Sequence, residues 1–239
     1  MNPQAYPTLE QFAANVALVL GKIEVIEQEL YDRVVYPTAG LNQFAFFTQP
    51  KGAGFSSETG NAGNTKTDAD TNMTQNGQLP APQAFWIDNV QVDFDPGSSA
   101  ATANTYVTQQ AFVSAAAPAA ATGIITGDTD KWAVLNAGWL QLFIGQKPYY
   151  QNGPMAYLPP RAQKRVDAAV GGNSATTANF AAKAIWTFGG VRTLDPGLGL
   201  PTGVNFGVNI NFPVLVPTPS TFNGRLKVQL GGWLFRAAQ

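Results

Sequence analysis

The chain has 239 residues, a formal net charge of −1 and only 12% charged residues, about half the usual share of a globular domain. It contains no Cys and no His, which excludes disulfides, thiolate chemistry and nucleophiles activated by histidine. We therefore expect no enzyme, no cofactor and no catalytic residue. A carboxylate enzyme using Asp88 remains a minor alternative.

Charge is distributed unevenly along the chain. The part up to Trp132 carries 5 basic and 13 acidic residues, and the remainder carries 9 basic and 2 acidic. One interpretation is that the two parts interleave in one fold and pair their charges. The other is that the basic part presents a face to an acidic neighbour, to nucleic acid or to lipid headgroups.

The first predicted element is one long helix from Thr8 to about Val35. Thr8 and Gln11 fit a capping box, and Pro37 and Gly40 follow the end. Apolar residues recur at helical spacing along it, at Phe12, Val16, Val19, Ile23, Ile26 and Leu30. This stripe packs either on its own domain or on another chain. We expect residues 1–37 to form a helical arm and residues 38–239 to form one β domain.

The rest of the chain has the pattern of a β protein with long loops. Strands are predicted at 41–48, 84–94, 105–114, within 132–146, at 180–188, at 204–212 and at 225–236. Loops are predicted at 50–82, 115–122, 148–160 and 189–203, and one or two helical turns at 161–170. No βαβ alternation is visible, so we expect an antiparallel β-sandwich or jelly-roll barrel.

Two strands change the parity of their apolar residues. The change falls at Asp88-Asn89 in one strand and at Gly231-Gly232 in the other. A single extra residue in a strand forms a β-bulge, which bends the strand. These positions therefore predict curved sheets.

Two short segments resemble ion-binding sites. Asp68, Asp70 and Asn72 alternate as in the first half of a calcium loop, but the positions that would need Gly and Glu are occupied by Met73 and Leu79. A polar loop without a metal is the favoured interpretation. The only basic cluster would share one face of a short helix and could contact an anion, and it consists of Arg161, Lys164 and Arg165.

Three longer stretches resemble a known family. They are TNMTQNGQLPAPQAFWIDNVQV from Thr71, GWLQLFIGQKPYYQNGPMAYLPP from Gly138, and RLKVQLGGWLFRA from Arg225. Their residue patterns and their order along the chain resemble those of jelly-roll capsid proteins of icosahedral bacteriophages, particularly tailless and membrane-containing ones. The resemblance implies a major capsid protein that assembles with copies of itself, as a trimer or a higher oligomer in a shell. It also implies location in the virion after synthesis in the host cytoplasm, and contact with other virion proteins, an internal membrane or the genome.

The stretch VNFGVNINF, from Val204 to Phe212, alternates apolar residues with asparagine and glycine. A side-chain amide both donates and accepts hydrogen bonds. Removing an amide from water costs less free energy than removing a charged group. This uncharged face meets either a loop of its own chain or a neighbouring subunit. The predicted subunit contacts are Phe12, Val16, Val19, Ile23, Ile26, Tyr149, Tyr150, Asn205, Asn209 and Asn211. The main alternative function is a non-enzymatic binding module, such as a spike, tail or lectin-like protein, that uses its loop tyrosines.

Overall fold

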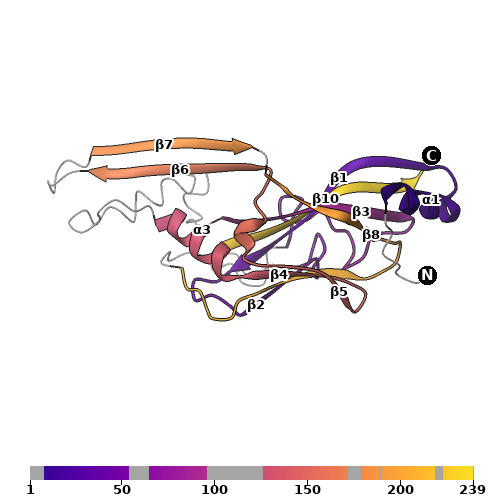
Figure 1. The fold of residues 1–239 in the computed structure, drawn as a ribbon. Helices are drawn as coiled ribbons and strands as arrows, with labels where there is room; N and C mark the ends of the chain where they lie inside the picture. Colours follow the sequence, from indigo (N-terminus) through magenta and orange to yellow (C-terminus); the bar gives the residue numbers. More distant parts are fainter. Residues whose placement is uncertain are drawn as a thin grey trace.

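Two four-stranded antiparallel sheets face each other in a β-sandwich-like arrangement (Figure 1). The computed structural model describes residues 8–53, 65–95, 126–171, 179–188, 190–218 and 223–238, with only the backbone of residues 126–130, 162–171 and 179–188. The first sheet has the order β1 (Ile23–Tyr36), β10 (Gly224–Ala237), β3 (Gln83–Asp95) and β8 (Arg192–Leu200). The second has the order β2 (Gln43–Phe46), β9 (Phe206–Asn211), β4 (Trp139–Ile144) and β5 (Lys147–Asn152).

Three helical segments and a two-stranded ribbon complete the described fold. They are α1 (Leu9–Leu20), α3 (Thr126–Ala137), the 3₁₀ turn η2 (Met155–Tyr157), and the paired strands β6 (Ala162–Gly171) and β7 (Asn179–Phe188). The ribbon extends away from the two sheets, on the side opposite to α1 (Figure 1).

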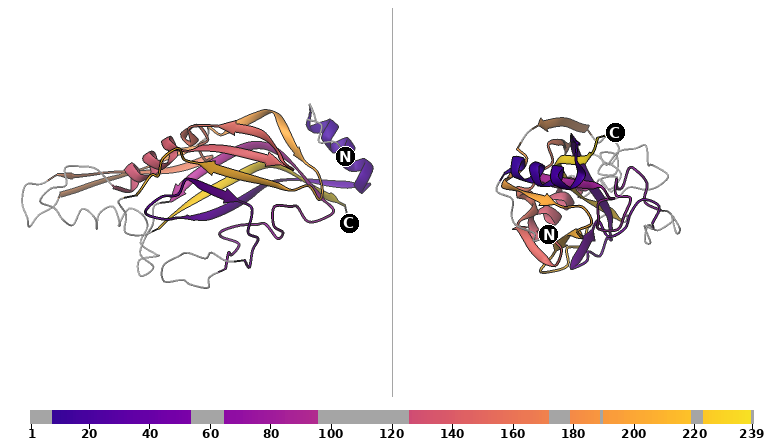
Figure 2. Two further views of the ribbon diagram at one scale, coloured as in Figure 1. Left: turned by 90° about the horizontal axis from the view of Figure 1, so that it is seen from below. Right: turned by 90° about the vertical axis from the view of Figure 1, so that its right-hand side faces the viewer.

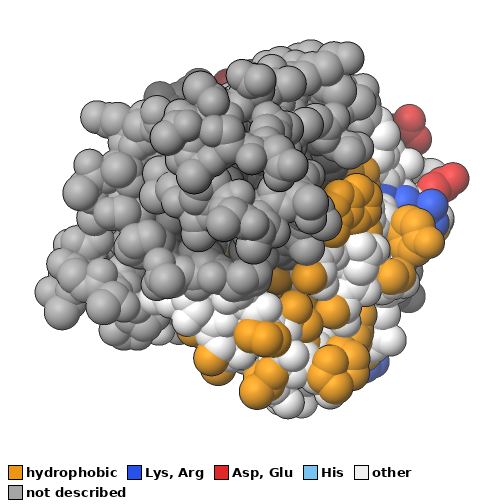
Figure 3. Space-filling model, turned by 90° about the vertical axis from the view of Figure 1, so that its left-hand side faces the viewer, with side chains coloured by type: hydrophobic (Ala, Val, Ile, Leu, Met, Phe, Trp, Pro, Cys, Tyr) orange, Lys and Arg blue, Asp and Glu red, His pale blue; other side chains and the backbone are white. Residues whose placement is uncertain are grey.

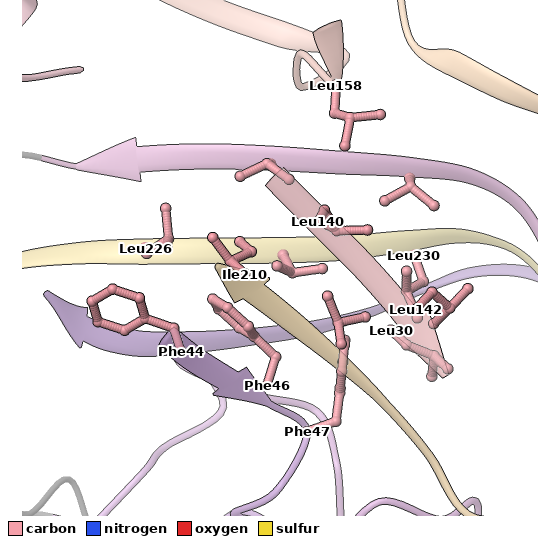
Figure 4. Close-up of a cluster of buried hydrophobic side chains, with 14 of the residues drawn as sticks. Leu30, Phe44, Phe46, Phe47, Leu140, Leu142, Leu158, Ile210, Leu226 and Leu230 are labelled. Atoms are coloured by element: carbon pink, nitrogen blue, oxygen red, sulfur yellow. The ribbon is translucent and has the colours of Figure 1, made fainter. Parts of the chain in front are cut away.

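The space between the two sheets is filled by one continuous apolar core (Figure 4). Phe44, Leu140 and Ile210 of the second sheet point toward Leu226 and Leu230 of the first. All five are at most 4% exposed, and burying a side chain of this size contributes about 1.5–3 kcal/mol. The alternating strands therefore meet through their apolar faces, as the period of two requires.

The two predicted parity changes meet at one bulge. Asn89 pairs with Gly231 and Ile87 pairs with Gly232, so Asp88 is the extra residue and belongs to β3. β10 keeps a continuous register with β1 through the same region. Its Trp233 and Phe235 face the opposite side from the main core and pack against α1 instead. The bulge in β3 is thus confirmed, whereas the parity change in β10 reflects a second layer.

The long N-terminal helix is wrong beyond Leu20. Thr8 caps the helix as predicted, since its hydroxyl accepts a hydrogen bond from the Gln11 amide at 3.2 Å. Gly21, at a φ of 78°, then ends the helix, and residues 23–36 form the edge strand β1. All fourteen of these residues pair with β10, and this pairing outweighs the local helical pattern. Residues 23–36 are therefore part of the first sheet and not of a helical arm.

Three further predictions need correction. The helical turns predicted at 161–170 are wrong, because residues 162–171 form β6 and pair with β7 along their whole length. β8 lies where a loop was predicted; it contains Pro196, which an edge strand tolerates. α3 was missed because its Gly, Thr and Asp residues are poor helix formers. The predicted strand at 105–114 and connector at 115–122 lie outside the described residues.

Tyr36 lies fully buried in the main core, and its ionisation should weaken the fold. Its hydroxyl donates a 2.7 Å hydrogen bond to the Val216 carbonyl, and burial raises its pKa to about 12. A tyrosine in the unfolded chain ionises near pH 10, so the unfolded state releases this proton first. We expect the urea midpoint of the wild type to fall more between about pH 10 and 12 than that of Tyr36→Phe. Equal falls in both proteins would contradict this expectation.

Candidate functional site

The candidate site is the outer face of the second sheet. Along β9, Val208 and Ile210 point inward and are fully buried, while Asn209 and Asn211 point outward and are half-buried. The neighbouring strands alternate in the same phase. We call the outward set the amide face, and it comprises Gln43, Ala45, Trp139, Gln141, Phe143, Gln151, Gly207, Asn209 and Asn211.

Strand register arranges the amide face in rows. Asn211 lies between Gln43 of β2 and Trp139 of β4. Asn209 lies between Ala45 and Gln141 in the next row. Directly opposed residues have Cβ atoms about 5 Å apart, so each row is a continuous strip of contact surface. Amides and aromatic or small side chains thus form one uninterrupted uncharged surface.

Lys147 is the only charged residue in the four strands of this sheet. The first sheet differs, because each of its strands carries at least two charged residues. On its outer face Arg33 lies 3.7 Å from Asp95 and Lys131 lies 2.5 Å from Asp93. The charged residues of the two sheets therefore lie almost entirely on the first sheet, and the second sheet is nearly uncharged.

The crowding of charges on the first sheet changes their titration. Burial raises the pKa of Asp95, and the neighbouring Asp93 carboxylate raises it further. Burial also lowers the pKa of Lys227, with Arg33 as the second cause. Such perturbation is expected where like charges are partly removed from water. The amide face carries no comparable cluster.

Neither described helix makes its principal contacts with the amide face. α1 packs on β10, β1 and β3, and α3 packs on η2 and β3. The left view of Figure 2 looks onto the second sheet from below, and no described helix crosses in front of it. Gln43, Ala45 and Gln151 are exposed, and Trp139 is 38% exposed.

The predicted apolar stripe does not form one contact surface. Phe12 and Val16 are buried within the chain itself, where Phe12 lies 5.5 Å from the Trp86 ring and 5.4 Å from the Phe235 ring. Val19 is 56% exposed, whereas Ile23 and Ile26 belong to β1 and are half-buried. Phe12 and Val16 thus attach α1 to its own sheet. In this arrangement they offer almost no surface to another chain.

Tyr149 and Tyr150 are not free loop residues. Both lie in β5, half-buried, and pack against the main core, so they offer little free surface. Asn205 is exposed just before β9, and its side-chain oxygen accepts a hydrogen bond from the Gln78 side chain. It borders the amide face, whereas Asn209 and Asn211 lie within it.

The three basic residues do not share a helical face. Arg161 is exposed and lies 3.8 Å from Glu27. Lys164 and Arg165 belong to the strand β6 and not to a helix. The shared helical face is therefore wrong, and contact of the three residues with an anion stays a prediction. The pairs Arg161–Glu27 and Arg236–Glu24 do join the basic part of the chain to the acidic part.

The calcium-like segment holds the loop to the sheet. Asp68 pairs with Lys51 at 2.6 Å, and Asp70 accepts two 2.9 Å hydrogen bonds from Thr67. The Asn72 side chain accepts from the Tyr31 amide and donates to the Glu29 carbonyl. All three side chains already have protein partners, which favours the polar-loop interpretation. In the described part of the chain no group of three or more His, Cys, Asp or Glu residues could hold a metal ion.

Trp139, Gln141 and Gln43 were missed as members of the candidate site. A usable signal was present, since Trp139, Gln141 and Phe143 alternate with buried residues and include no charge.

Comparison with protein-family models, with curated proteins and with solved structures finds no match to this chain. No helix among the described residues has the length and apolar character needed to cross a membrane.

Proposed function

We propose that this chain is a shell-forming coat protein of an icosahedral bacteriophage, which assembles with copies of itself through the amide face. The proposal assigns the chain to the virion and gives it no catalytic role. The uncharged outer face of the second sheet is the observation that carries it.

Strand order supports a jelly-roll connectivity for this protein. When the β6–β7 ribbon is set aside, eight strands remain in the two sheets. We number these eight strands one to eight along the chain. Strand one (β1) pairs with strand eight (β10), and strand three (β3) pairs with strand six (β8). In the other sheet, strand two (β2) pairs with strand seven (β9), and strand four (β4) pairs with strand five (β5). Folding one long hairpin over itself produces these pairs, and jelly rolls of this kind occur in viral capsid and lectin domains.

The chemistry of the amide face favours contact with another copy. Burying a charged side chain without a partner is far more unfavourable than burying an amide that finds a hydrogen bond. Asn and Gln carry both donors and acceptors, so a second protein surface of similar composition can satisfy them. Trp139 adds an aromatic side chain of the type enriched in interfaces.

Exposed apolar residues extend the amide face at one end. Three strands of six residues and one of four, spaced about 4.8 Å apart, cover roughly 360 Å². This is a little less than half of the roughly 800 Å² that each partner buries in a typical stable interface. Leu41 precedes β2 and is 48% exposed, and Val214 and Leu215 follow β9 and are 65% and 55% exposed. Figure 3 looks onto the end of the molecule opposite to α1, where hydrophobic side chains lie close together on the surface. These residues supply contact area next to the amide face.

A charge placed in the centre of the amide face should strongly weaken assembly. In Asn209→Lys we expect an unchanged circular dichroism spectrum and an oligomer at least about tenfold weaker, because the ammonium group must lose its water. Light scattering after size-exclusion chromatography measures the mass, and negative-stain microscopy shows whether particles form.

Two variants separate the position from the charge. Gln75→Lys adds the same charge to an exposed loop residue and should assemble normally. Asn209→Gln keeps the amide and should assemble at least in part. A wild-type protein that stays monomeric at about 100 μM, near the weak limit of specific association, would contradict the proposal. Normal assembly of Asn209→Lys would place the interface elsewhere.

A further inference from the structure

A second site lies on the opposite sheet, at the β3 bulge. Glu29 of β1, Gly231 of β10 and Asn89 of β3 form one row across the outer face of the first sheet. Because Gly231 has no side chain, the row is interrupted by a hollow of about 500 Å³. Glu27 and Arg161 also line the hollow.

The buried Asn89 carboxamide points into this hollow in a defined orientation. The Arg161 backbone amide donates to the Gln91 side-chain oxygen at 2.9 Å, so the Gln91 amide nitrogen faces Asn89. That nitrogen donates to the Asn89 oxygen at 2.8 Å, so the Nδ2 group is the end of the amide left to donate. The whole amide lies beside Gly231.

Asn89 is only 6% exposed, and among the described residues nothing accepts a hydrogen bond from its Nδ2 group. The Nδ2 atom is open to the hollow, because only Arg33 Nε and Thr218 Oγ1 are buried without a partner among the described side chains. It can therefore donate to a ligand in the hollow.

Gly231 keeps the hollow open. A Cβ atom at this position would lie 2.6 Å from both polar atoms of the Asn89 amide. Any other residue would therefore cover the amide that the neighbouring hydrogen bonds orient. The glycine at the bulge thus has a consequence for binding as well as for backbone geometry.

Both donors and acceptors line the hollow. Glu27 and Glu29 supply carboxylate acceptors, whereas Asn89 Nδ2 and the Arg161 guanidinium supply donors. The Gln229 amide donates to Glu29 at 2.8 Å and holds that carboxylate in place. A cationic ligand would meet the Arg161 charge and the Asn89 donor, and an anionic ligand would meet two carboxylates. Vicinal hydroxyl groups both donate and accept, so they match the set.

We propose that the hollow at the β3 bulge, lined by Glu27, Glu29, Asn89 and Arg161, binds a neutral saccharide. The site lies on the sheet opposite to the amide face, so it can be occupied whether or not copies associate.

Saturation-transfer difference NMR on the full chain tests the site with glucose, galactose, N-acetylglucosamine and lactose as probes. We expect at least one saccharide to bind. Its affinity should fall at least about tenfold in Glu27→Gln and in Asn89→Asp, since each variant replaces one group required by a hydroxyl. Glu27 is largely exposed, so Glu27→Gln keeps the test valid if Asn89→Asp does not fold.

Glu24→Gln is the matched control, because Glu24 lies on the same strand but pairs with Arg236 outside the hollow. It should bind the saccharide like the wild type. The proposal would be overturned if none of the four saccharides bound. It would also be overturned if a saccharide bound equally well to Glu27→Gln and to Asn89→Asp. Binding of methylguanidinium in place of every saccharide would also overturn it and would indicate a cation site.

Discussion

Replacing Asp32 by Asn should lower the free energy of unfolding by about 3–5 kcal/mol, the usual loss when a buried ion pair loses one partner. Asp32 and Lys66 are 0% and 3% exposed, and their side chains lie 2.5 Å apart. Burial raises the pKa of Asp32, while Lys66 and the Phe47 amide oppose this by favouring the carboxylate. Without the carboxylate, the Lys66 ammonium group stays in the core and loses the opposite charge that lies 2.5 Å away.

The position of Asp32 explains why the effect should be large. Its second oxygen accepts a 2.6 Å hydrogen bond from the amide of Phe47, a fully buried residue with a φ of 64°. This left-handed conformation is unfavourable by about 1–2 kcal/mol for a residue with a side chain. One carboxylate therefore holds both the turn after β2 and the loop that contains Lys66. Urea denaturation followed by tryptophan fluorescence measures the loss.

An exposed ion pair of similar geometry provides the control for this experiment. Lys51 and Asp68 lie 2.6 Å apart, with side chains 48% and 75% exposed. Asp68→Asn should therefore lower stability by less than about 1 kcal/mol. The double replacement Asp32→Leu with Lys66→Met should lose less than Asp32→Asn, because it removes both charges. Similar losses in Asp32→Asn and Asp68→Asn would show that burial of the pair is unimportant.

Gly232→Ala should lower stability by about 3 kcal/mol or more, near the upper end for a single added methyl group. A Cβ atom at this position would lie 1.8 Å from the Trp86 carbonyl oxygen and 3.1 Å from the Asp88 amide nitrogen. Both neighbours are backbone atoms of β3, so no side-chain rotation can make room. The strands must separate at the bulge, where the pairing of β10 with β3 changes register.

Gly207 is the matched glycine, because it also lies within a strand paired on both sides. Its nearest contact to an added Cβ would be the Phe46 carbonyl oxygen at 3.6 Å, an ordinary van der Waals distance. Gly207→Ala should therefore be neutral or slightly stabilising, since glycine is unfavourable in strands. Urea midpoints of both variants measure the difference, and a Gly232→Ala protein as stable as Gly207→Ala would contradict the close approach.

Local alternation was sufficient to predict part of the fold and part of the candidate site. In β9 every second residue is apolar, and the structure buries Val208 and Ile210 as that pattern requires. The same pattern placed Asn209 and Asn211 on the outer face. The parity change at Asp88 likewise predicted the bulge in β3. Such patterns are reliable because a strand has only two faces and one of them must meet the core.

The N-terminal region shows where local reasoning fails. Ile23, Ile26 and Leu30 continue the helical spacing of α1, yet they belong to β1. A short run of apolar residues can satisfy both a period of 3.6 and a period of two when few positions are filled. Pairing with β10, which lies about two hundred residues later in the chain, decides between them.

By itself the sequence determined the absence of histidine and cysteine chemistry, the β class, the alternation of β9 and the bulge in β3. Only the tertiary structure decided that β1 is a strand, that α1 covers its own sheet, and that nearly all charge in the two sheets lies on one of them. Strand pairing also brought Trp139 and Gln43 beside Asn211, and Glu29 and Asn89 to either side of Gly231. The physical reason is that a period of two specifies a face, whereas the neighbours on that face depend on long-range pairing.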